Sequence, residues 1–198
     1  MAGAPLLFGG SFDPIHLGHL IAAEFAAEAL RSTEVWFVPA REQPFKVGRH
    51  GASAEHRLRM LRVAVAGHPR FRVDAMELER PAPSYTVDTV RALAARLNAR
   101  VTLLVGSDAA RELPTWREAD ELLRLADVAV YERAGQSAGA LPYAAQRITV
   151  PLVGISATEI RERVGAGRTI RYLVPEAVRA YITGLALYRH DDDSGTGG

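Results

Sequence analysis

The sequence predicts an α/β fold in which a doubly wound parallel sheet carries helices on both faces. Short apolar runs typical of buried strands alternate along the chain with amphipathic, helix-like segments. Glycine and polar residues follow two of the strands, as expected where a parallel sheet binds a ligand beyond the carboxyl ends of its strands. No linker divides residues 1–190, so we expect one domain there, followed by a polar, disordered tail over residues 191–198.

Each element follows from a local pattern. Strands are expected where short apolar runs end at glycine, proline or a polar cluster, and helices where apolar residues recur every three or four positions. Ser53 is the expected cap of one helix, and Thr86 or Ser84 the expected cap of the next. The strands span residues 5–8, 34–39, 71–79, 101–105, 127–132 and 147–152. The helices span a segment that ends near residue 31, then 55–66, 86–98, a short stretch after 108, 117–125, 156–165 and a last segment opened by Pro175.

The bulk composition is that of an ordinary globular protein. The chain has 198 residues, of which 48% are hydrophobic, and a formal net charge of +1 at pH 7. This balance gives no support to a nucleic-acid partner or to a charged membrane-binding surface. The sequence has no cysteine, no apolar run long enough to span a membrane and no signal-peptide pattern. We therefore expect a cytoplasmic protein, and a homo-oligomer is compatible with the sequence.

Residues 9–20 read Gly-Gly-Ser-Phe-Asp-Pro-Ile-His-Leu-Gly-His-Leu between the first strand and the first helix. Two adjacent glycines allow a tight turn, and the helix start offers N–H groups and the positive end of its dipole to an anion. His16 and His19 are three residues apart, which predicts that they share one face of the first turn and indicates catalysis on a phosphate. The pattern is neither the dinucleotide fingerprint nor the Walker loop. A solvent-exposed histidine pair and a weak zinc site are the alternatives.

A second glycine-containing strand end lies further along the chain. Gly106 and Asp108 follow the strand over residues 101–105. If this strand neighbours the first one, both strand ends face one crevice. Asp108 then either binds a ribose hydroxyl or caps the helix that follows.

A third candidate anion site lies near the C-terminus. Ser156 and Glu159 form a capping-box pattern, which predicts a helix start. A helix start is also a phosphate cradle, and Arg161 lies further along the same helix, where its planar guanidinium can reach phosphate oxygens.

Residues 9–19 resemble the signature of the nucleotidyltransferase superfamily that carries the His-x-Gly-His motif. Residues 154–161 resemble the Ile-Ser-Ser-Thr-x-Ile-Arg motif of the same superfamily, with Ala157 where the family has a second serine. The resemblance implies a Rossmann-like fold of the nucleotidyltransferase type and Mg²⁺ that is carried with ATP rather than held by a protein metal site. It implies that the catalytic residues are His16, His19 and Arg161. It implies that ATP is bound by Gly9, Gly10, Ser11, Phe12, Gly106, Asp108, Ile155, Ser156 and Thr158.

Residues 83–89, 105–116 and 172–189 resemble bacterial nicotinate-nucleotide adenylyltransferases. This resemblance implies adenylyl transfer from ATP to nicotinate mononucleotide, which gives deamido-NAD and pyrophosphate in NAD biosynthesis. Trp116 is expected to stack on the pyridine ring, since a flat heteroaromatic ring suits an indole face; a core tryptophan is the alternative. Lys46 is the only lysine of the chain. The residues implied to bind nicotinate mononucleotide are Lys46, Ser84, Tyr85, Thr86, Trp116 and Arg133.

The effects of two further departures from the family's sequence pattern, and two alternative functions, stay open. Phe45 replaces a histidine of the family's Pro-Pro-His-Lys loop, and Ala134 replaces a proline of its Arg-Pro-Gly segment. A phosphopantetheine adenylyltransferase shares both terminal motifs, and a non-catalytic nucleotide-binding regulator shares the fold. The preference for nicotinate over nicotinamide mononucleotide depends on backbone geometry that the sequence does not give.

Overall fold

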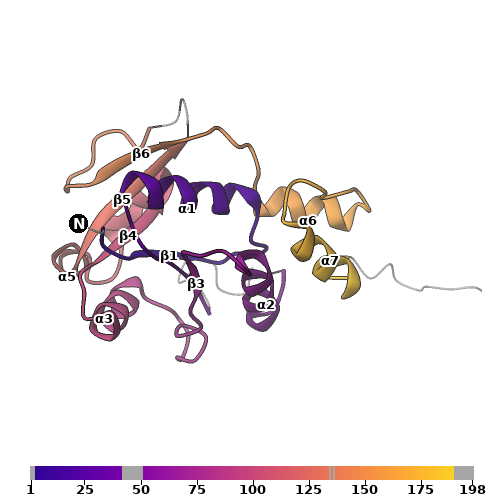
Figure 1. Cartoon of the computed structure of the whole chain (residues 1–198), viewed down its shortest axis with the longest axis horizontal. Coiled ribbons are helices and arrows are strands. Elements are labelled where there is room, and N and C mark those ends of the chain that lie inside the picture. Colours follow the sequence, from indigo (N-terminus) through magenta and orange to yellow (C-terminus); the bar gives the residue numbers. More distant parts are fainter. Residues whose placement is uncertain (1–2, 42–50, 134, 136, 190–198) are drawn as a thin grey trace, which may run out of the picture.

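The computed structural model describes residues 3–41, 51–133, 135 and 137–189. At its centre lies a six-stranded parallel sheet in the order β3-β2-β1-β4-β5-β6 (Figure 1). The chain runs outward from β1 to one edge, returns to β4 beside β1 and runs outward to the other edge. The predicted doubly wound sheet is therefore confirmed. The strands are β1 Leu6–Gly10, β2 Val35–Pro39, β3 Phe71–Val73, β4 Val101–Gly106, β5 Ala126–Arg133 and β6 Gln146–Val150.

Helices cover both faces of the sheet because successive side chains of each buried strand point to opposite sides. Leu6 and Phe8 of β1 pack into a core shared with α1 and α2, whereas Leu7 packs into a second core shared with α3, α4 and α5. A 3₁₀ turn over Leu113–Thr115 links α4 to the segment before α5. The helices are α1 Leu17–Ala29, α2 Ala54–Val65, α3 Thr86–Leu97, α4 Ser107–Glu112, α5 Ala119–Leu125, α6 Ala157–Gly165 and α7 Glu176–Gly184.

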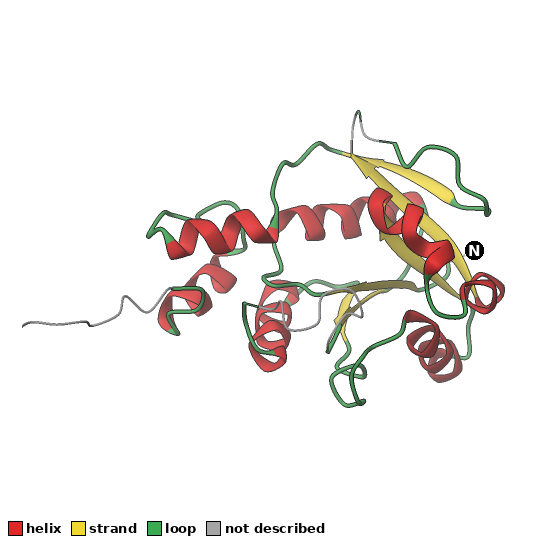
Figure 2. Cartoon of the chain, turned by 180° about the vertical axis from the view of Figure 1, so that it is seen from behind, coloured by secondary structure: helices red, strands yellow, loops and turns green. Residues whose placement is uncertain are grey.

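The last two helices, α6 and α7, lie at one end of the sheet rather than over it (Figures 1 and 2). Ile160 of α6 and Val178 of α7 are buried in the same core as Phe8, and α7 packs against α2. The Leu17 N–H at the start of α1 donates to the Leu173 carbonyl at 3.0 Å. The C-terminal segment therefore lies beside the start of α1, although the two are far apart in the sequence.

The prediction of a long strand over residues 71–79 is wrong after Val73. Asp74 Oδ1 accepts the Met76 N–H at 2.8 Å, and the Leu78 N–H donates to the Ala75 carbonyl at 2.8 Å. These bonds turn the chain out of the sheet, because an aspartate that bonds the backbone two residues on favours a turn. The alternation of apolar and polar residues extends only to Ala75 and is broken by the adjacent Met76, so it does not describe a strand there.

Two of the predicted helix caps are confirmed and two are wrong. Ser53 Oγ accepts the His56 N–H, and Ser156 Oγ accepts the Glu159 N–H at 3.1 Å. The cap of α3 is Tyr85, which makes no side-chain cap bond, so neither Ser84 nor Thr86 caps that helix. The alternative that Asp108 caps the helix after β4 is also wrong. Gly106 is the N-cap residue of α4, and the Asp108 carboxylate instead forms an ion pair with Arg111.

The sheet places the two glycine-containing strand ends next to each other. β1 pairs with β4, so Gly9 and Gly10 lie beside Gly106 at the carboxyl edge of the sheet, where the strand order reverses. Among the described residues, no helix is long and apolar enough to cross a membrane. The tail predicted over residues 191–198 lies outside the described residues.

Candidate active site

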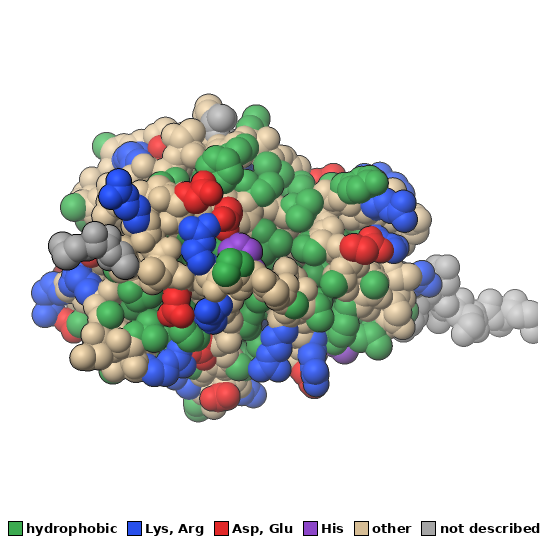
Figure 3. Space-filling model, viewed as in Figure 1, with side chains coloured by type: hydrophobic (Ala, Val, Ile, Leu, Met, Phe, Trp, Pro, Cys, Tyr) green, Lys and Arg blue, Asp and Glu red, His purple; other side chains and the backbone are tan. Residues whose placement is uncertain are grey.

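A cavity of about 1090 Å³ opens at the carboxyl ends of β1 and β4. Every sequence-predicted site residue that the structure describes lines it, whereas Lys46 and Phe45 lie outside the described residues. The space-filling view shows a histidine side chain near the middle of one face, with basic and acidic side chains beside it (Figure 3). The lining candidates are His16, His19, Arg161, Gly9, Gly10, Ser11, Phe12, Gly106, Asp108, Ile155, Ser156, Thr158, Ser84, Tyr85, Thr86, Trp116 and Arg133.

The two histidines lie together at the start of α1, as the three-residue spacing predicts. His16 is the N-cap residue, with extended backbone angles, and His19 lies in the first turn. Their rings stack with centroids 3.7 Å apart and planes inclined by 26°. The buried Phe12 ring meets the His19 ring edge-on at 5.2 Å and so supports it from the core side. The alternative of a solvent-exposed pair does not hold, because His16 is only 4% exposed.

His16 is a neutral imidazole in the free protein at neutral pH. Burial, and then the positive charge of Arg133, lower the pKa of His16 to about 4. Its Nδ1 atom is buried and has no hydrogen-bond partner among the described residues. His16 also lines the cavity, so its imidazole lies where a ligand in the cavity would meet it.

Asp13 lines the cavity and connects its own turn to three other segments of the chain. Its carboxylate is 3% exposed and accepts the Gly51 N–H at 2.7 Å, the Ala52 N–H at 3.1 Å and the Tyr188 hydroxyl at 2.7 Å. Its carbonyl accepts a bond from Arg161 Nη1 at 2.7 Å. Asp13 therefore joins the turn after β1 to the start of α2, to α6 and to the segment that follows α7.

Arg161 and the start of α6 form a second cationic and N–H-rich wall of the cavity. Arg161 Nη2 donates to Thr158 Oγ1 at 3.3 Å, so the guanidinium lies over the first turn of the helix. The N–H groups of a first helical turn have no carbonyl in front of them within the helix. Such N–H groups and a guanidinium are the donors that phosphate oxygens accept in general, so phosphate binding at this wall stays a prediction.

The opposite wall is built around the start of α3. Ser84 Oγ accepts the Arg41 N–H at 3.2 Å, and the Arg117 guanidinium lies 4.5 Å from the centre of the Tyr85 ring. Trp116 ends the 3₁₀ turn and is half-buried, with part of its indole on the cavity. Trp116 thus combines contact with the core and contact with the cavity, so the alternative of a fully buried core tryptophan does not hold.

A buried carboxyl group lies behind this wall. Glu77 is 7% exposed, lines the cavity and accepts the Thr89 hydroxyl at 2.5 Å. Burial raises the pKa of Glu77, although its hydrogen bonds and Arg80 partly oppose that shift.

The ends of β4 and β5 complete the cavity. An added Cβ on Gly106 would lie 2.9 Å from the Tyr131 hydroxyl, so only glycine leaves room for this phenol. Tyr131 is largely buried and meets Phe8 edge-on, and burial raises its pKa. Arg133, at the end of β5, brings a positive charge to the same edge.

The described residues do not form a metal cage. No group of three His, Cys, Asp or Glu side chains among them is placed to hold a metal ion. The stacked rings of His16 and His19 also differ from the converging ligands of a zinc site.

Several lining or supporting residues were not found from the sequence. Asp13 and Tyr188 lie inside quoted motifs, but their contact joins segments that only the fold brings together. Arg117 directly follows Trp116, and this adjacency was the one local signal that could have found it. Thr89 also lies inside a quoted motif, that of residues 83–89, whereas Glu77 and Tyr131 carry no local signal.

Comparison with known proteins identifies the family. The family model for cytidylyltransferase-like proteins matches residues 7–163. A relative from Thermus thermophilus is 49% identical over 185 residues, which cover 92% of this chain and 98% of the relative. A relative from Geobacillus thermodenitrificans is 46% identical over 183 residues, covering 92% of this chain and 84% of the relative. Both carry the curated name "Probable nicotinate-nucleotide adenylyltransferase".

Two solved structures share the fold at low sequence identity. Nicotinic acid mononucleotide adenylyltransferase of Plasmodium falciparum, complexed with NaAD, matches with a TM-score of 0.76 and 20% identity, covering 94% of this chain and 97% of that one. A structure named as a nicotinate-nucleotide adenylyltransferase of Vibrio parahaemolyticus matches with a TM-score of 0.71 and 16% identity, over 96% and 97% of the two chains. From the family model and the curated relatives together, this chain belongs to the nicotinate-nucleotide adenylyltransferase family, a family of nucleotidyltransferase enzymes.

Proposed function

We propose that the cavity transfers the adenylyl group of ATP to nicotinate mononucleotide, which gives deamido-NAD and pyrophosphate. The observation that carries this proposal is the meeting of two helix N-termini, those of α1 and α6, across one cavity whose far wall holds Trp116 and the start of α3. Two N–H-rich helix starts suit a polyphosphate, and an indole face suits a pyridine ring. The names of the curated relatives and of both solved structures support the same reaction.

The reaction is a displacement at the α-phosphorus of ATP. A phosphate oxygen of nicotinate mononucleotide forms a bond to that phosphorus, and the bond from the phosphorus to the bridging oxygen breaks, so pyrophosphate leaves with the electron pair. Such a step depends on positioning and on neutralising charge rather than on a covalent intermediate. We assign the triphosphate to His16, His19 and Arg161, with Ser156 and Thr158 as further donors. In the free protein His16 is neutral, because burial and the charge of Arg133 lower its pKa to about 4, and its imidazole N–H can donate to a phosphate oxygen.

The remaining candidates divide between the two substrates. We assign the adenosine of ATP to residues 9–12, to Gly106 and Asp108, and to Ile155 at the start of α6. We assign the pyridine ring to Trp116, and its carboxylate to Ser84, Tyr85 and Thr86 before and at the start of α3. Arg133, together with Lys46 outside the described residues, is assigned to the phosphate of the mononucleotide.

Mg²⁺ is the divalent metal that we propose for this reaction, and it enters with ATP. Bound to the phosphates, it supplies charge neutralisation for the leaving pyrophosphate. The chain's own contribution is the set of N–H, imidazole and guanidinium donors described above, which hold the phosphates in place. A cytoplasmic location and a single domain over residues 1–190 stay predictions of the sequence.

Pyrophosphate release by the purified protein with ATP and Mg²⁺ tests the proposal. We expect strong turnover with nicotinate mononucleotide and little with nicotinamide mononucleotide or phosphopantetheine. His19→Ala is the matched control variant and should abolish turnover with an unchanged circular dichroism spectrum. Pyrophosphate release with phosphopantetheine alone would contradict nicotinate mononucleotide as the acceptor. Release with none of the three compounds would favour the alternative of a non-catalytic regulator.

A further inference from the structure

A buried guanidinium joins the ends of two neighbouring strands beneath the cavity. Arg57 of α2 is 1% exposed. Its Nη1 donates to the Ser11 carbonyl at 2.7 Å and to the Ala40 carbonyl at 2.7 Å, and its Nη2 donates to the Arg41 carbonyl at 3.0 Å. Ser11 follows β1 and Ala40 follows β2, so one side chain fixes both strand ends relative to each other.

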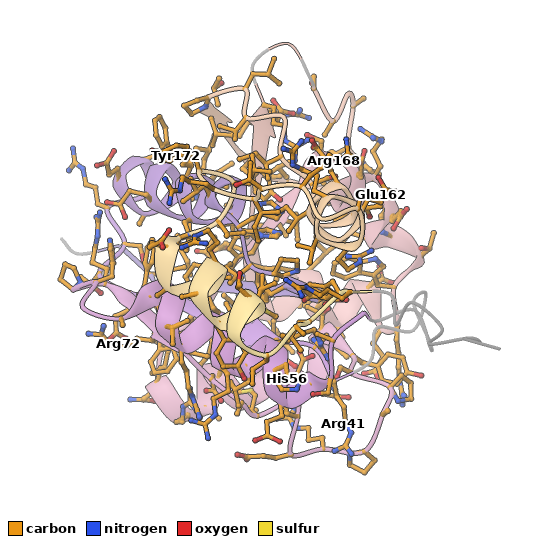
Figure 4. The ribbon with its side chains drawn as sticks, turned by 90° about the vertical axis from the view of Figure 1, so that its right-hand side faces the viewer. Arg41, His56, Arg72, Glu162, Arg168 and Tyr172 are labelled. Atoms are coloured by element: carbon orange, nitrogen blue, oxygen red, sulfur yellow. The ribbon has the colours of Figure 1, made fainter. Side chains whose placement is uncertain are left out.

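The main chain and side chain of Arg41 extend this connection to the opposite wall. The Arg41 N–H donates to Ser84 Oγ at 3.2 Å, and Arg41 Nη1 donates to the carbonyls of Leu78 and Arg80 at 2.7 and 3.3 Å. Figure 4 shows Arg41 on the same side of the molecule as His56 of α2. A continuous series of hydrogen bonds therefore runs from Ser11, through the Arg57 side chain and the Arg41 main chain, to Ser84. The Arg41 side chain adds a branch to the segment before Ser84.

The physical cost of Arg57 indicates that it has a specific task. Placing a guanidinium in the core carries a desolvation penalty, and an apolar side chain of similar length avoids that penalty. Burial accordingly lowers the pKa of Arg57, while the negative charge of Asp13 and the Tyr188 hydroxyl group oppose the shift. An apolar side chain cannot donate to three carbonyls at once, whereas the planar guanidinium fork can.

We infer that Arg57 and Arg41 are positioning residues that together fix the ATP-binding loop, residues 9–12, relative to the acceptor turn, residues 84–86. This inference rests on the proposed function, in which these two segments hold different substrates. In-line displacement requires the attacking oxygen and the α-phosphorus to be aligned, and a misplacement of about 1 Å can cost about a hundredfold in rate. Removing either the Arg57 fork or the Arg41 side-chain branch should therefore slow the reaction between the two bound substrates more than it weakens the binding of either substrate alone.

Two variants remove different parts of this network. Arg57→Lys keeps the positive charge and one donor nitrogen but loses the second nitrogen that reaches the Arg41 carbonyl. Arg41→Ala removes the side-chain branch to the Leu78 and Arg80 carbonyls and leaves the main-chain bonds of Arg41 in place. Arg100→Ala is the matched control, since Arg100 also donates to a backbone carbonyl, that of Arg124, at the opposite end of the sheet.

The measurements are kcat with both substrates saturating, calorimetric affinity for nicotinate mononucleotide alone and for a non-hydrolysable ATP analogue alone, and thermal unfolding. We expect kcat to fall about tenfold in each variant, which corresponds to about 1.4 kcal/mol. We expect each separate affinity to stay within about twofold of the wild-type value, and Arg100→Ala to retain the wild-type kcat. A general loss of structure would instead weaken the separate affinities.

The double variant tests whether the two residues act in series. If they do, its kcat should match that of the less active single variant, because losing the Arg41 branch has no further effect once the connection at Arg57 is broken. A loss equal to the product of the two single losses would overturn the inference. If Arg57→Lys does not fold, Arg41→Ala decides alone, and a wild-type kcat there overturns the inference. Absence of turnover in the wild-type protein would contradict the proposed function itself, whereas wild-type turnover with unaffected variants would contradict this inference alone.

Discussion

An added Cβ on Gly18 would lie 3.1 Å from the Cε1 and Nδ1 atoms of His16. Gly18 is the second residue of α1, so its glycine is not required by a turn or a left-handed backbone. The glycine between the two histidines instead leaves the space in which the His16 ring lies, stacked on the His19 ring. The spacing His-x-Gly-His thus has a steric explanation in this fold.

Gly18→Ala should lower activity without unfolding the protein. Replacing glycine by alanine inside a helix is worth about 0.5–1 kcal/mol of stability, which offsets part of the crowding. The new methyl group must displace the His16 ring by a few tenths of an ångström, and so disturbs the stack that we assign to the triphosphate. We expect kcat/KM for ATP to fall at least about tenfold, with a change in Tm of only a few degrees.

Gly184→Ala is the control for that variant. Gly184 is also a helical glycine, the last residue of α7, and an added Cβ there would meet no atom within 4 Å. Its activity should equal that of the wild type. Equal activity of Gly18→Ala and the wild type would contradict the steric explanation.

The neutral state of His16 can be measured directly. Because burial and Arg133 lower its folded-state pKa to about 4, the native protein takes up this proton less readily than the unfolded chain does. Stability associated with His16 is therefore fully present above about pH 6.5 and is lost as the pH falls toward 4, by about 3 kcal/mol in total. Nitrogen-15 NMR of the imidazole rings should show His16 still neutral at pH 5.5. In urea unfolding, the free energy of unfolding of His16→Asn should fall less between pH 6.5 and 4 than that of the wild type. An NMR signal of His16 that titrates near pH 6.5 would contradict this explanation.

The sequence predicted those parts of the fold and site that depend on local pattern. The order of strands and helices follows from apolar runs, and the helix starts at Ser53 and Ser156 follow from capping residues. The strand after Phe71 was predicted too long, because a turn held by Asp74 competes with the strand and alternating hydrophobicity does not reveal it. Ser84 was predicted as a cap, but its hydroxyl is bonded to Arg41, which is distant in the sequence.

The supporting contacts of the site could not be predicted from sequence, since they join segments that only the fold brings together. Asp13 lies 38 residues from Gly51 and 175 residues from Tyr188, yet it accepts a hydrogen bond from each. Arg57 looked like one polar position on an amphipathic helix, and nothing local marks it as buried. Motifs therefore predicted which residues line the cavity, whereas the contacts that hold those residues in place required the three-dimensional structure.

Tyr188→Phe should destabilise the protein and weaken the site together. The variant removes a hydroxyl donor from the buried Asp13 carboxylate, and a hydrogen bond to a charged group contributes about 1.5–3 kcal/mol. Asp13 also accepts a hydrogen bond from the Gly51 N–H. A Cβ atom added to Gly51 would lie 2.8 Å from the Arg161 side chain, which shows that Gly51 and Arg161 are closely packed. We expect the free energy of unfolding, measured with urea, to fall by about 2 kcal/mol, and kcat to fall severalfold.

Tyr181→Phe provides the matched comparison within the C-terminal segment. The Tyr181 hydroxyl bonds His56 Nδ1 at 2.9 Å, at the contact between α7 and α2 and outside the cavity lining. The free energy of unfolding of this variant should be about 1 kcal/mol lower than that of the wild type, whereas its kcat should be unchanged. The interpretation of Tyr188 as a support of the site would be wrong if both variants retained full activity at a temperature where both are folded.

Glu77→Gln should stabilise the protein in a pH-dependent way. Burial raises the folded-state pKa of Glu77, so the native state binds this proton more tightly than the unfolded chain does. Stability linked to Glu77 is therefore fully present below the unfolded-state pKa and is lost as the pH rises through the raised value. Glutamine is never charged, and its side-chain oxygen can still accept a hydrogen bond from the Thr89 hydroxyl.

The Tm of Glu77→Gln should exceed that of the wild type at pH 8, and the difference should shrink as the pH falls toward 4. Glu79→Gln, at an exposed position two residues on, is the control and should keep the wild-type dependence of Tm on pH. A Tm difference between Glu77→Gln and the wild type that stays constant from pH 8 to 4 would mean that the substitution acts through packing and not through the buried charge.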